Sequence, residues 1–409
     1  MDQFDIQTLR QTLERASRLF QTPAISLTVI QNGQTIFSEG FGTRTLGRPE
    51  PVDGDTSYAI ASMSKSTVSM SLAMLHEQNL FRWEDKVTRF LPDFRLYDNF
   101  ASQEITVIDL LKHNCGLNSE SAGTLWYGSD YSREEVIQRL RYLRPVSGFR
   151  SAYAYQNVCF LVAGMIIEKI SGISWDDFVA ENIFKPLEME RSFANLTALQ
   201  RAGIENIATP HTQIDGKLTA IPYRNHDNVG PAASAHSTTN DLSRYLQLFL
   251  EEGAAQGKQL LKPESVAFLQ RLHTVYAPTL EKDLLHPRLK SNFTGYGLGW
   301  HIQDYQGHKR VGHSGGVDGM RGRMDLFPDD QCAVAVLTNS EDRRAGQSVL
   351  YTVYDMLLRL DPVDWVEIWQ NDPEKNTAPF SPQQLPGTHA SLLLQHYEGI
   401  YRDSAYGEI

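Results

Sequence analysis

Apolar residues recur with two different periods along the chain, and each period predicts a different kind of element. At the start, four apolar residues recur every three to four positions, as on one face of a helix: Leu9, Leu13, Ala16 and Phe20. Two β-strands, 24–30 and 34–40, are expected next around Asn32-Gly33, a dipeptide typical of tight hairpin turns. The chain is therefore predicted to open with an amphipathic helix and a β-hairpin.

The middle of the chain, from about residue 80 to 225, has mainly the helical period. Two of its predicted helices begin with a serine followed three positions later by an acidic residue, the spacing of an N-terminal cap: Ser132 with Glu135, and Ser174 with Asp177. A shorter helix over 105–113 is expected to be capped at its C-terminal end by Gly116. This part of the chain is predicted to be all-helical.

Beyond residue 296 the pattern changes to the alternation that is typical of antiparallel strands. Four strands are expected in succession: 296–304, 308–312, 321–327 and 332–337. A final helix is expected over 346–360, where apolar residues return to the helical period. The order of elements predicts an α+β fold, with a mainly antiparallel sheet flanked by helices.

The C-terminal part has a different character. Residues 371–391 contain four prolines among polar residues and show no periodicity, which predicts a linker. Residues 397–407 are rich in aromatic residues and glycine, like the start of a β-strand module. We therefore expect a main domain over 1–361, the remainder of a helix and a linker over 362–390, and the truncated start of a C-terminal β module over 391–409.

Composition excludes several classes of partner. The 409 residues carry a formal net charge of -11, which argues against a surface for nucleic acid or for an anionic membrane. The longest apolar run, 160–167, is too short to span a bilayer. The N-terminus lacks the basic and apolar segments of a signal peptide, so we expect a cytoplasmic protein, or a secreted or periplasmic one if a leader precedes it.

Cysteine and histidine patterns point to no cofactor. The three cysteines, Cys115, Cys159 and Cys332, are far apart in the sequence, and they are expected to be reduced and mostly buried. The twelve histidines form no His-Glu-x-x-His pattern, and no glycine-rich phosphate loop follows a strand. Neither a metal nor another cofactor is therefore expected.

The first of three candidate catalytic motifs is Ser62-x-x-Lys65, at the start of a helix expected over 61–79. Residues three apart lie on one face of a helix, so the lysine amine can reach the serine hydroxyl. Serine is a weak nucleophile until a base takes its proton, and a lysine can be that base if burial lowers its pKa. In the structural alternative, Ser62 caps the helix and Lys65 is solvated.

The second motif is Tyr155-x-Asn157, in a loop before a helix expected over 158–170. A phenol can transfer a proton if a nearby cation lowers its pKa, and an amide can hold a substrate carbonyl. In the structural alternative, Tyr155 belongs to the core and Asn157 caps the helix.

The third motif, Gly312-His313-Ser314-Gly315-Gly316, allows two interpretations. It matches the Gly-x-Ser-x-Gly nucleophile elbow of α/β-hydrolases, with Ser314 as nucleophile, but an elbow is followed by a helix and its histidine comes later in the chain. Here a strand is expected to follow, and the only later histidines lie in or beside the predicted linker. In the other interpretation, the glycines admit a substrate to a strand edge and His313 faces the site as a polar or cationic group.

In this order, the three motifs resemble the serine β-lactamase and penicillin-binding superfamily. The match is best to its class C-like branch, which includes D-aminopeptidases, DD-carboxypeptidases and β-lactamase-fold esterases. The resemblance covers about residues 4–360. It implies a three-layer β-lactamase/transpeptidase-like fold, with the helical region of about 80–225 inserted between the Ser62 helix and the later strands.

The resemblance also implies roles for these residues. Ser62 attacks a carbonyl and becomes acylated, while Lys65 and Tyr155 share the general-base and general-acid roles. The backbone N–H groups of Ser62 and Gly316 form the oxyanion hole, in keeping with the positive end of a helix dipole at Ser62. The residues that bind the substrate are then Asn157, His313, Ser314 and Gly315.

Two departures from the superfamily pattern bear on function. His313 takes the place often held by lysine, so recognition of a substrate carboxylate is expected to be weaker or pH-dependent. Asn114-Cys115 stands where relatives often have Thr-Ser. The C-terminal segment resembles the start of the small β-barrel module of some peptidase-like relatives. Together with the two departures, it favours a peptidase or esterase over an efficient β-lactamase.

We therefore expect a serine hydrolase that cleaves amide or ester bonds of a small molecule or short peptide, for instance one with a D-residue. Its assembly as a homo-oligomer is left open by the sequence. The first alternative is a β-lactamase proper, which hydrolyses β-lactam rings. The second is a non-catalytic penicillin-binding-like protein with a binding or regulatory role.

Overall fold

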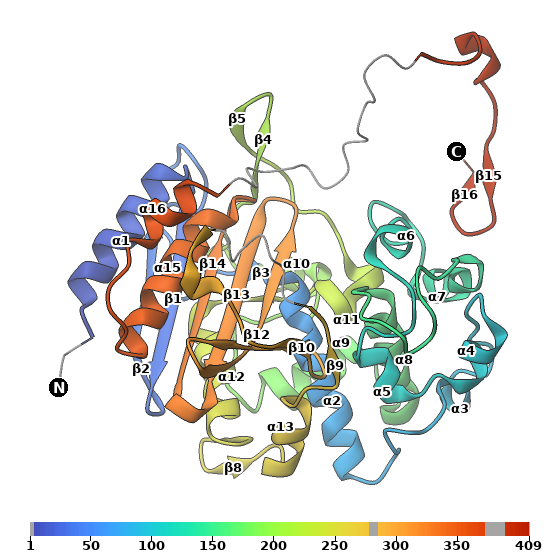
Figure 1. The fold of residues 1–409 in the computed structure, drawn as a ribbon, viewed down its shortest axis with the longest axis horizontal. Coiled ribbons are helices and arrows are strands. Elements are labelled where there is room, and N and C mark those ends of the chain that lie inside the picture. Colours follow the sequence, from blue (N-terminus) through green and yellow to red (C-terminus); the bar gives the residue numbers. More distant parts are fainter. Residues whose placement is uncertain (1–3, 278–284, 373–388, 409) are drawn as a thin grey trace.

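A single antiparallel sheet of eight strands organises the protein, in the order β2-β1-β14-β13-β12-β11-β10-β9 (Figure 1). The computed structural model describes residues 4–277, 285–372 and 389–408. Helices cover both faces of the sheet, and a larger group of helices lies beside it (Figure 1). The predicted α+β architecture is confirmed, but the inserted region is not all-helical, because it contains a short β-hairpin over 211–220.

The N-terminal prediction is confirmed. Helix α1 spans Ile6–Leu19, and the hairpin strands are β1 (Ala24–Gln31) and β2 (Gln34–Gly42). Asn32 and Gly33 both have positive φ values, 51° and 72°, as a two-residue hairpin turn of this kind requires.

The later strands differ from the prediction in their limits. The segment expected as one strand over 296–304 contains parts of two, β10 (Thr294–Tyr296) and β11 (His301–Tyr305). The strand expected to end at Gly312 continues to Val317: the remaining strands are β12 (His308–Val317), β13 (Met320–Phe327) and β14 (Cys332–Thr338). Strand β11 pairs with β12 only as far as Gly312. In the described chain, the last part of β12 therefore has a neighbouring strand, β13, on one side only.

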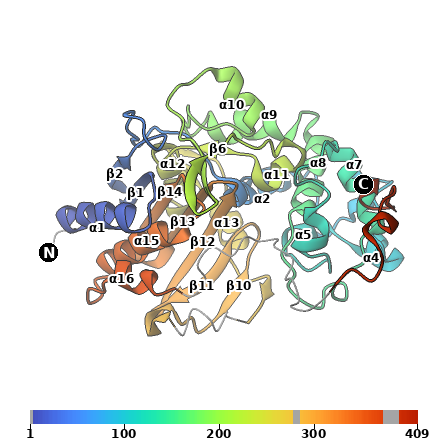
Figure 2. The same cartoon turned by 90° about the horizontal axis from the view of Figure 1, so that it is seen from above.

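One face of the sheet is covered by three helices from the two ends of the chain: α1, α15 (Arg343–Leu357) and α16 (Trp365–Gln370) (Figure 2). Apolar side chains of β1 and β14 pack against them in one buried cluster, to which α16 contributes Trp365 and Trp369. The helix expected within 362–390 is thus α16, and it belongs to the core of the main domain. The rest of the expected linker, 373–388, lies outside the described residues.

The other face of the sheet packs against helices that carry or surround the first motif. Helix α2 (Lys65–Glu77) is buried on almost every side, between the sheet and the helical region. The remaining helices are α3 (Val87–Phe90), α4 (Asn99–Glu104), α5 (Val107–Leu111), α6 (Ser119–Gly123), α7 (Arg133–Arg139), α8 (Val158–Ser171), α9 (Trp175–Val179), α10 (Leu196–Ala202), α11 (Gly230–Ala233), α12 (Thr239–Leu250) and α13 (Pro263–Leu269).

Short strands complete the secondary structure: β3 (Tyr58–Ala59) with β6 (His236–Ser237), β4 (His211–Ile214) with β5 (Lys217–Ala220), β7 (Ala254–Ala255) with β8 (Lys258–Gln259), β9 (Thr274–Val275), and β15 (Arg402–Asp403) with β16 (Gly407–Glu408). The C-terminal segment with the β15–β16 hairpin lies beside α7 in both views (Figures 1 and 2). Tyr131 and Arg139 each donate a side-chain hydrogen bond to its backbone.

The two predicted N-terminal helix caps are confirmed, and the one predicted C-terminal cap is wrong. The Ser132 and Ser174 side chains cap α7 and α9. The expected C-terminal cap at Gly116 is wrong, because α5 ends at Leu111 with Lys112 as its cap, and the next residue, His113, already has a left-handed φ of 53°. Within the described residues no single helix is long and apolar enough to cross a membrane, although the bent pair Val158–Ser171 and Trp175–Phe184 meets that test jointly.

Candidate active site

Ser62 lies on one 3₁₀ turn, η1 (Ala61–Ser64), immediately before α2. The turn is anchored at Ile60, whose N–H donates to the Ala235 carbonyl at 2.9 Å. Ala61 has a left-handed φ of 49°, a conformation that costs a residue with a side chain about 1–2 kcal/mol. The structural alternative for Ser62 does not hold, since Ser64 occupies the cap position of α2.

The amine of Lys65 is the centre of the site. Its Nζ is 3.0 Å from the Ser62 hydroxyl, 2.6 Å from Asn157 Oδ1 and 3.0 Å from the Ala232 carbonyl. The side chain is fully buried, so the solvated alternative for Lys65 is wrong. Three segments far apart in the sequence therefore converge on one nitrogen.

A neutral amine can make these three contacts. Burial holds the pKa of Lys65 well below its ordinary value, because the charged form would lose its hydration. Asn157 Oδ1 and the Ala232 carbonyl can only accept hydrogen bonds, so they take the two N–H groups of a neutral amine. The lone pair is then left for the third neighbour, the Ser62 hydroxyl, which can donate its proton to it.

Tyr155 contacts the same serine from the other side. Its hydroxyl donates to Ser62 Oγ at 2.9 Å. Burial raises the pKa of Tyr155, and the hydrogen bond to Ser62 opposes that effect only in part. This corrects the expectation that a cation would lower the pKa of this phenol. Tyr155 is therefore protonated at neutral pH, as a proton donor must be.

Asn157 is free to bind Lys65 because another residue caps its helix. Asn157 stands at the cap position of α8 but makes no side-chain capping bond. The Gln156 side chain does this instead, since its Oε1 accepts from the Cys159 N–H at 2.7 Å. The structural alternative for Asn157 is therefore wrong.

The loop that carries these residues, 153–157 (the Tyr155 loop), is anchored by His113, which the sequence did not single out. The His113 carbonyl accepts from the Ala154 N–H at 2.7 Å, and its Nδ1 accepts from the Gln156 N–H at 3.3 Å. Its ring lies 4.4 Å from that of Tyr155. Ala232 was also missed, because a backbone acceptor leaves no side-chain signal; the only hint was the run of small residues around it.

His313 is near Ser62 but is not a cation. It is 1% exposed, and burial, together with nearby His301 and Lys65, holds its pKa well below the ordinary value. Its Nδ1 lies 2.6 Å from the Ser314 carbonyl, to which it can only donate, and its Nε2 lies 2.9 Å from the Tyr296 hydroxyl. Of the two outcomes expected for His313, a neutral ring agrees with weaker recognition of a substrate carboxylate and not with titration near neutral pH.

Gly315 brings strand β12 against the serine turn. A side chain at this position is excluded, because a Cβ would lie 2.1 Å from the Ile60 carbonyl oxygen. Gly316 follows on the opposite face, where a Cβ would meet the Arg321 guanidinium at 2.2 Å. Because β11 has ended at this point, β12 presents an open edge beside Ser62.

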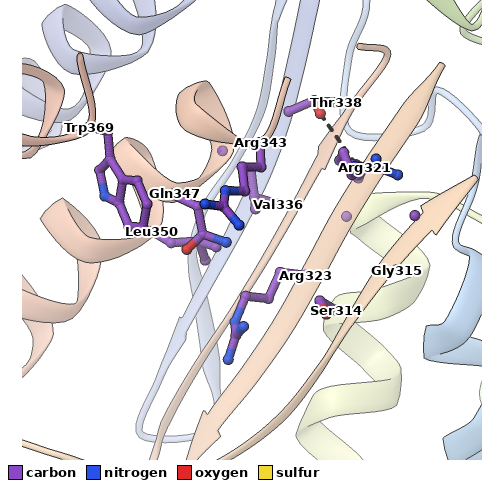
Figure 3. A pocket seen from close by; sticks show the side chains of 13 residues that line it. Ser314, Gly315, Arg321, Arg323, Val336, Thr338, Arg343, Gln347, Leu350 and Trp369 are labelled. Atoms are coloured by element: carbon purple, nitrogen blue, oxygen red, sulfur yellow. Dashed lines mark hydrogen bonds between the residues drawn. The ribbon is translucent and has the colours of Figure 1, made fainter. Parts of the chain in front are cut away.

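Ser314 lines a separate pocket (Figure 3), on the face of β12 opposite to the one that Gly315 turns toward the serine turn. The pocket has a volume of about 290 Å³ and lies between β12, β13 and the α15–α16 layer. Three arginines line it, namely Arg321, Arg323 and Arg343. The elbow interpretation of Ser314 is wrong, since the strand continues to Val317 and leads into β13 instead of a helix.

In the described parts of the chain, no group of three or more His, Cys, Asp or Glu side chains is arranged to hold a metal ion.

Comparison with known protein families matches residues 9–353 to the family described as β-lactamase. Among curated proteins, the chain is 26% identical to unguisins hydrolase ungD' of Aspergillus campestris, over all of this chain and 77% of that protein. It is 23% identical to penicillin-binding protein 4* of Bacillus subtilis, over 88% of this chain and 76% of the relative.

Two solved structures share the fold. The octameric penicillin-binding protein homologue from Pyrococcus abyssi superposes with a TM-score of 0.76, at 24% identity, over 87% of this chain and 78% of that one. A D-stereospecific amidohydrolase from Streptomyces gives a TM-score of 0.66, at 20% identity, over 84% of this chain and 97% of that one.

Replacing Lys65 should change how stability depends on pH. Because burial lowers the pKa of Lys65 only in the folded state, the unfolded chain binds one more proton between the two pKa values. The free energy of unfolding of the parent should therefore rise relative to that of Lys65→Met as the pH increases from 7 to about 9.5. The rise is at most about 1.4 kcal/mol per pH unit.

Urea denaturation at several pH values measures this difference, with the exposed Lys185→Met as the matched control. A difference between parent and Lys65→Met that stays constant with pH would contradict a depressed pKa.

Proposed function

This chain belongs to the β-lactamase family, and from that premise we propose that it is a serine hydrolase which cleaves an amide or ester bond through an acyl-enzyme on Ser62. One observation carries the proposal. The Ser62 hydroxyl lies between a buried amine, 3.0 Å away at Lys65, and a phenol, 2.9 Å away at Tyr155. One neighbour is suited to take a proton and the other to give one.

Acylation then uses the two neighbours in different roles. Neutral Lys65 takes the Ser62 proton as Ser62 Oγ attacks the substrate carbonyl, and the new ammonium is stabilised by Asn157 Oδ1 and the Ala232 carbonyl. Tyr155 gives its proton to the leaving group, and the Lys65 ammonium restores the tyrosine proton. A water molecule then attacks the acyl carbonyl, and the same proton transfers run in the opposite direction, so that Ser62 regains its proton and the acyl group is released as an acid.

The carbonyl oxygen becomes negatively charged in the tetrahedral intermediate and needs donors. The backbone N–H groups of Ser62 and Gly316 are the proposed pair, supported by the contact between Gly315 and the serine turn. Losing one such donor typically costs about 2.7–4 kcal/mol in the transition state.

The proposed substrate is a peptide amide or a small ester, with peptides that contain a D-residue as the first class to examine. The curated relatives include one named as a hydrolase of unguisins and one named as a penicillin-binding protein, and a structural neighbour is named as a D-stereospecific amidohydrolase. These names support amide hydrolysis over other chemistries. A β-lactam is the competing substrate.

We further propose that the substrate carries an anionic group, bound by Arg321. In the described residues, Arg323 and Arg343 pair with carboxylates, at Asp325 and Asp372, whereas Arg321 forms no ion pair. Its guanidinium lies against Gly316, next to the proposed oxyanion hole. To reach it from Ser62, a carboxylate on the residue after the scissile bond would pass around the open edge of β12 into the pocket beside Ser314, on the other face of the sheet (Figure 3). In this proposal Arg321 supplies the positive charge that the neutral His313 does not.

Ser62 should be the residue that a fluorophosphonate labels. The parent and Ser314→Ala should both gain the mass of one phosphonyl group, and Ser62→Ala should gain none. Ser62→Ala should also lower kcat on any good substrate by about 10³-fold or more. Labelling of Ser62→Ala together with loss of labelling in Ser314→Ala would refute the assignment.

A screen of p-nitrophenyl esters, D- and L-aminoacyl anilides and a cephalosporin identifies the substrate class, with Ser62→Ala as control. We expect turnover of a D-aminoacyl anilide or an ester. Efficient turnover of the cephalosporin alone would instead favour a β-lactamase proper.

Arg321→Gln should separate substrates by charge. For a peptide with a free carboxylate, KM should rise about tenfold or more, which is about 1.4 kcal/mol, because the ion pair is lost. For the same peptide as its C-terminal amide, KM should change by less than about twofold. Arg10→Gln, which removes an ion pair with Glu39 at the far edge of the sheet, is the matched control. An equal effect on both peptides would contradict recognition of the carboxylate by Arg321.

A further inference from the structure

Two of the three cysteines lie side by side beneath the proposed site. Cys115 Sγ and Cys159 Sγ are 3.4 Å apart, and both residues are buried. Cys115 follows α5 in the segment that begins at His113, and Cys159 is in the first turn of α8. They are 44 positions apart in the sequence, so no spacing rule could pair them.

Both cysteines belong to segments that hold the Tyr155 loop from opposite sides. His113, two residues before Cys115, binds the Ala154 and Gln156 N–H groups. On the other side, the Cys159 N–H is bound by the Gln156 side chain, and Asn157 lies two residues before it. A covalent bond between the two sulfurs would therefore connect the two supports of Tyr155 and Asn157.

We propose that Cys115 and Cys159 form a reversible disulfide on exposure to a peroxide, and that this bond slows acylation of Ser62. The proposal of slower acylation rests on the proposed function, whereas the bond itself does not. A disulfide is about 2.05 Å long, so the two sulfurs must approach by more than 1 Å. A displacement of this size in groups that hold catalytic side chains can reduce rates by about 10²-fold.

The chemistry balances with hydrogen peroxide as oxidant. The Cys115 thiolate attacks one peroxide oxygen and becomes a sulfenic acid, while the other oxygen leaves and is protonated to water. The Cys159 sulfur then attacks the Cys115 sulfur, and the sulfenic oxygen leaves as a second water. The two thiols lose two protons and two electrons, and the peroxide takes up both.

Cys115 is the better candidate for the first step. The hydrogen bond from Cys159 lowers the pKa of Cys115, and burial only partly opposes this. Cys332, in β14, serves as a reference because burial raises its pKa to about 12. A thiol that resists ionisation is oxidised slowly.

The test treats the full chain with hydrogen peroxide, then denatures it and alkylates it with N-ethylmaleimide. The reduced protein should take up three maleimides. The oxidised protein should take up one, lose two mass units before alkylation, and yield a crosslinked Cys115–Cys159 peptide. Phosphonylation of Ser62 by a fluorophosphonate, which uses the same nucleophile as acylation, should slow by about tenfold or more and recover after dithiothreitol.

Matched variants separate this pair from the third cysteine. Cys332→Ser should form the bond and lose acylation rate as the parent does, whereas Cys115→Ser and Cys159→Ser should keep their acylation rates in peroxide. Three reactive thiols after oxidation, a bond to Cys332, or a bond without any change in acylation rate would each overturn the proposal. If the reduced protein is not acylated at all, the proposed function fails, and the mass and peptide results still decide whether the bond forms.

Discussion

The buried amine of Lys65 is the interaction on which the rest of the site depends. A charged lysine in this environment would lose its hydration, and no carboxylate contributes to its shifted pKa. The neutral form is accommodated because two oxygen acceptors, at Asn157 and Ala232, are fixed where its two N–H groups point. The serine turn, the Tyr155 loop and the segment before β6 must all be in place for this arrangement to exist, so the fold and the chemistry are coupled through one nitrogen.

Close approach of neighbouring elements at two glycines makes that arrangement geometrically feasible. Gly315 lets β12 pass against the Ile60 carbonyl, and Gly164 lets α8 contact Pro231 of α11, next to Ala232. In both places a Cβ would lie less than 2.5 Å from its neighbour. Overpacking of this kind typically costs about 1–3 kcal/mol. Small residues at these positions therefore determine how near the catalytic groups can come to one another.

Much of the fold could be predicted from local signals, and the order of the motifs indicated the superfamily. The Asn32-Gly33 turn, the serine caps of α7 and α9 and the alternation of the late strands depend on neighbouring residues, so the sequence contains them directly. Strand limits were less accurate, because β12 continues beyond the end of its pairing with β11 and is paired with β13 as far as Val317.

The properties of the site residues depended on packing that the sequence does not display. His313 is neutral because it is enclosed, and the pKa of Tyr155 rises because burial outweighs its hydrogen bond. Ser314 faces the arginine pocket because alternate residues of a strand point to opposite faces, and Gly315 is the residue that faces Ser62. The contacts of His113, of the Ala232 carbonyl and between Cys115 and Cys159 join segments far apart in the chain.

The most direct test of Lys65 as a neutral base is the pH dependence of the rate constant for phosphonylation of Ser62 by a fluorophosphonate. If Lys65 is a neutral base, the rate should rise with pH through a pKa well below that of an ordinary lysine and then stay level above pH 9, where Tyr155 is still protonated. A rate that keeps rising to about pH 10.5, as expected for a solvated lysine, would contradict the role of Lys65 as a neutral base.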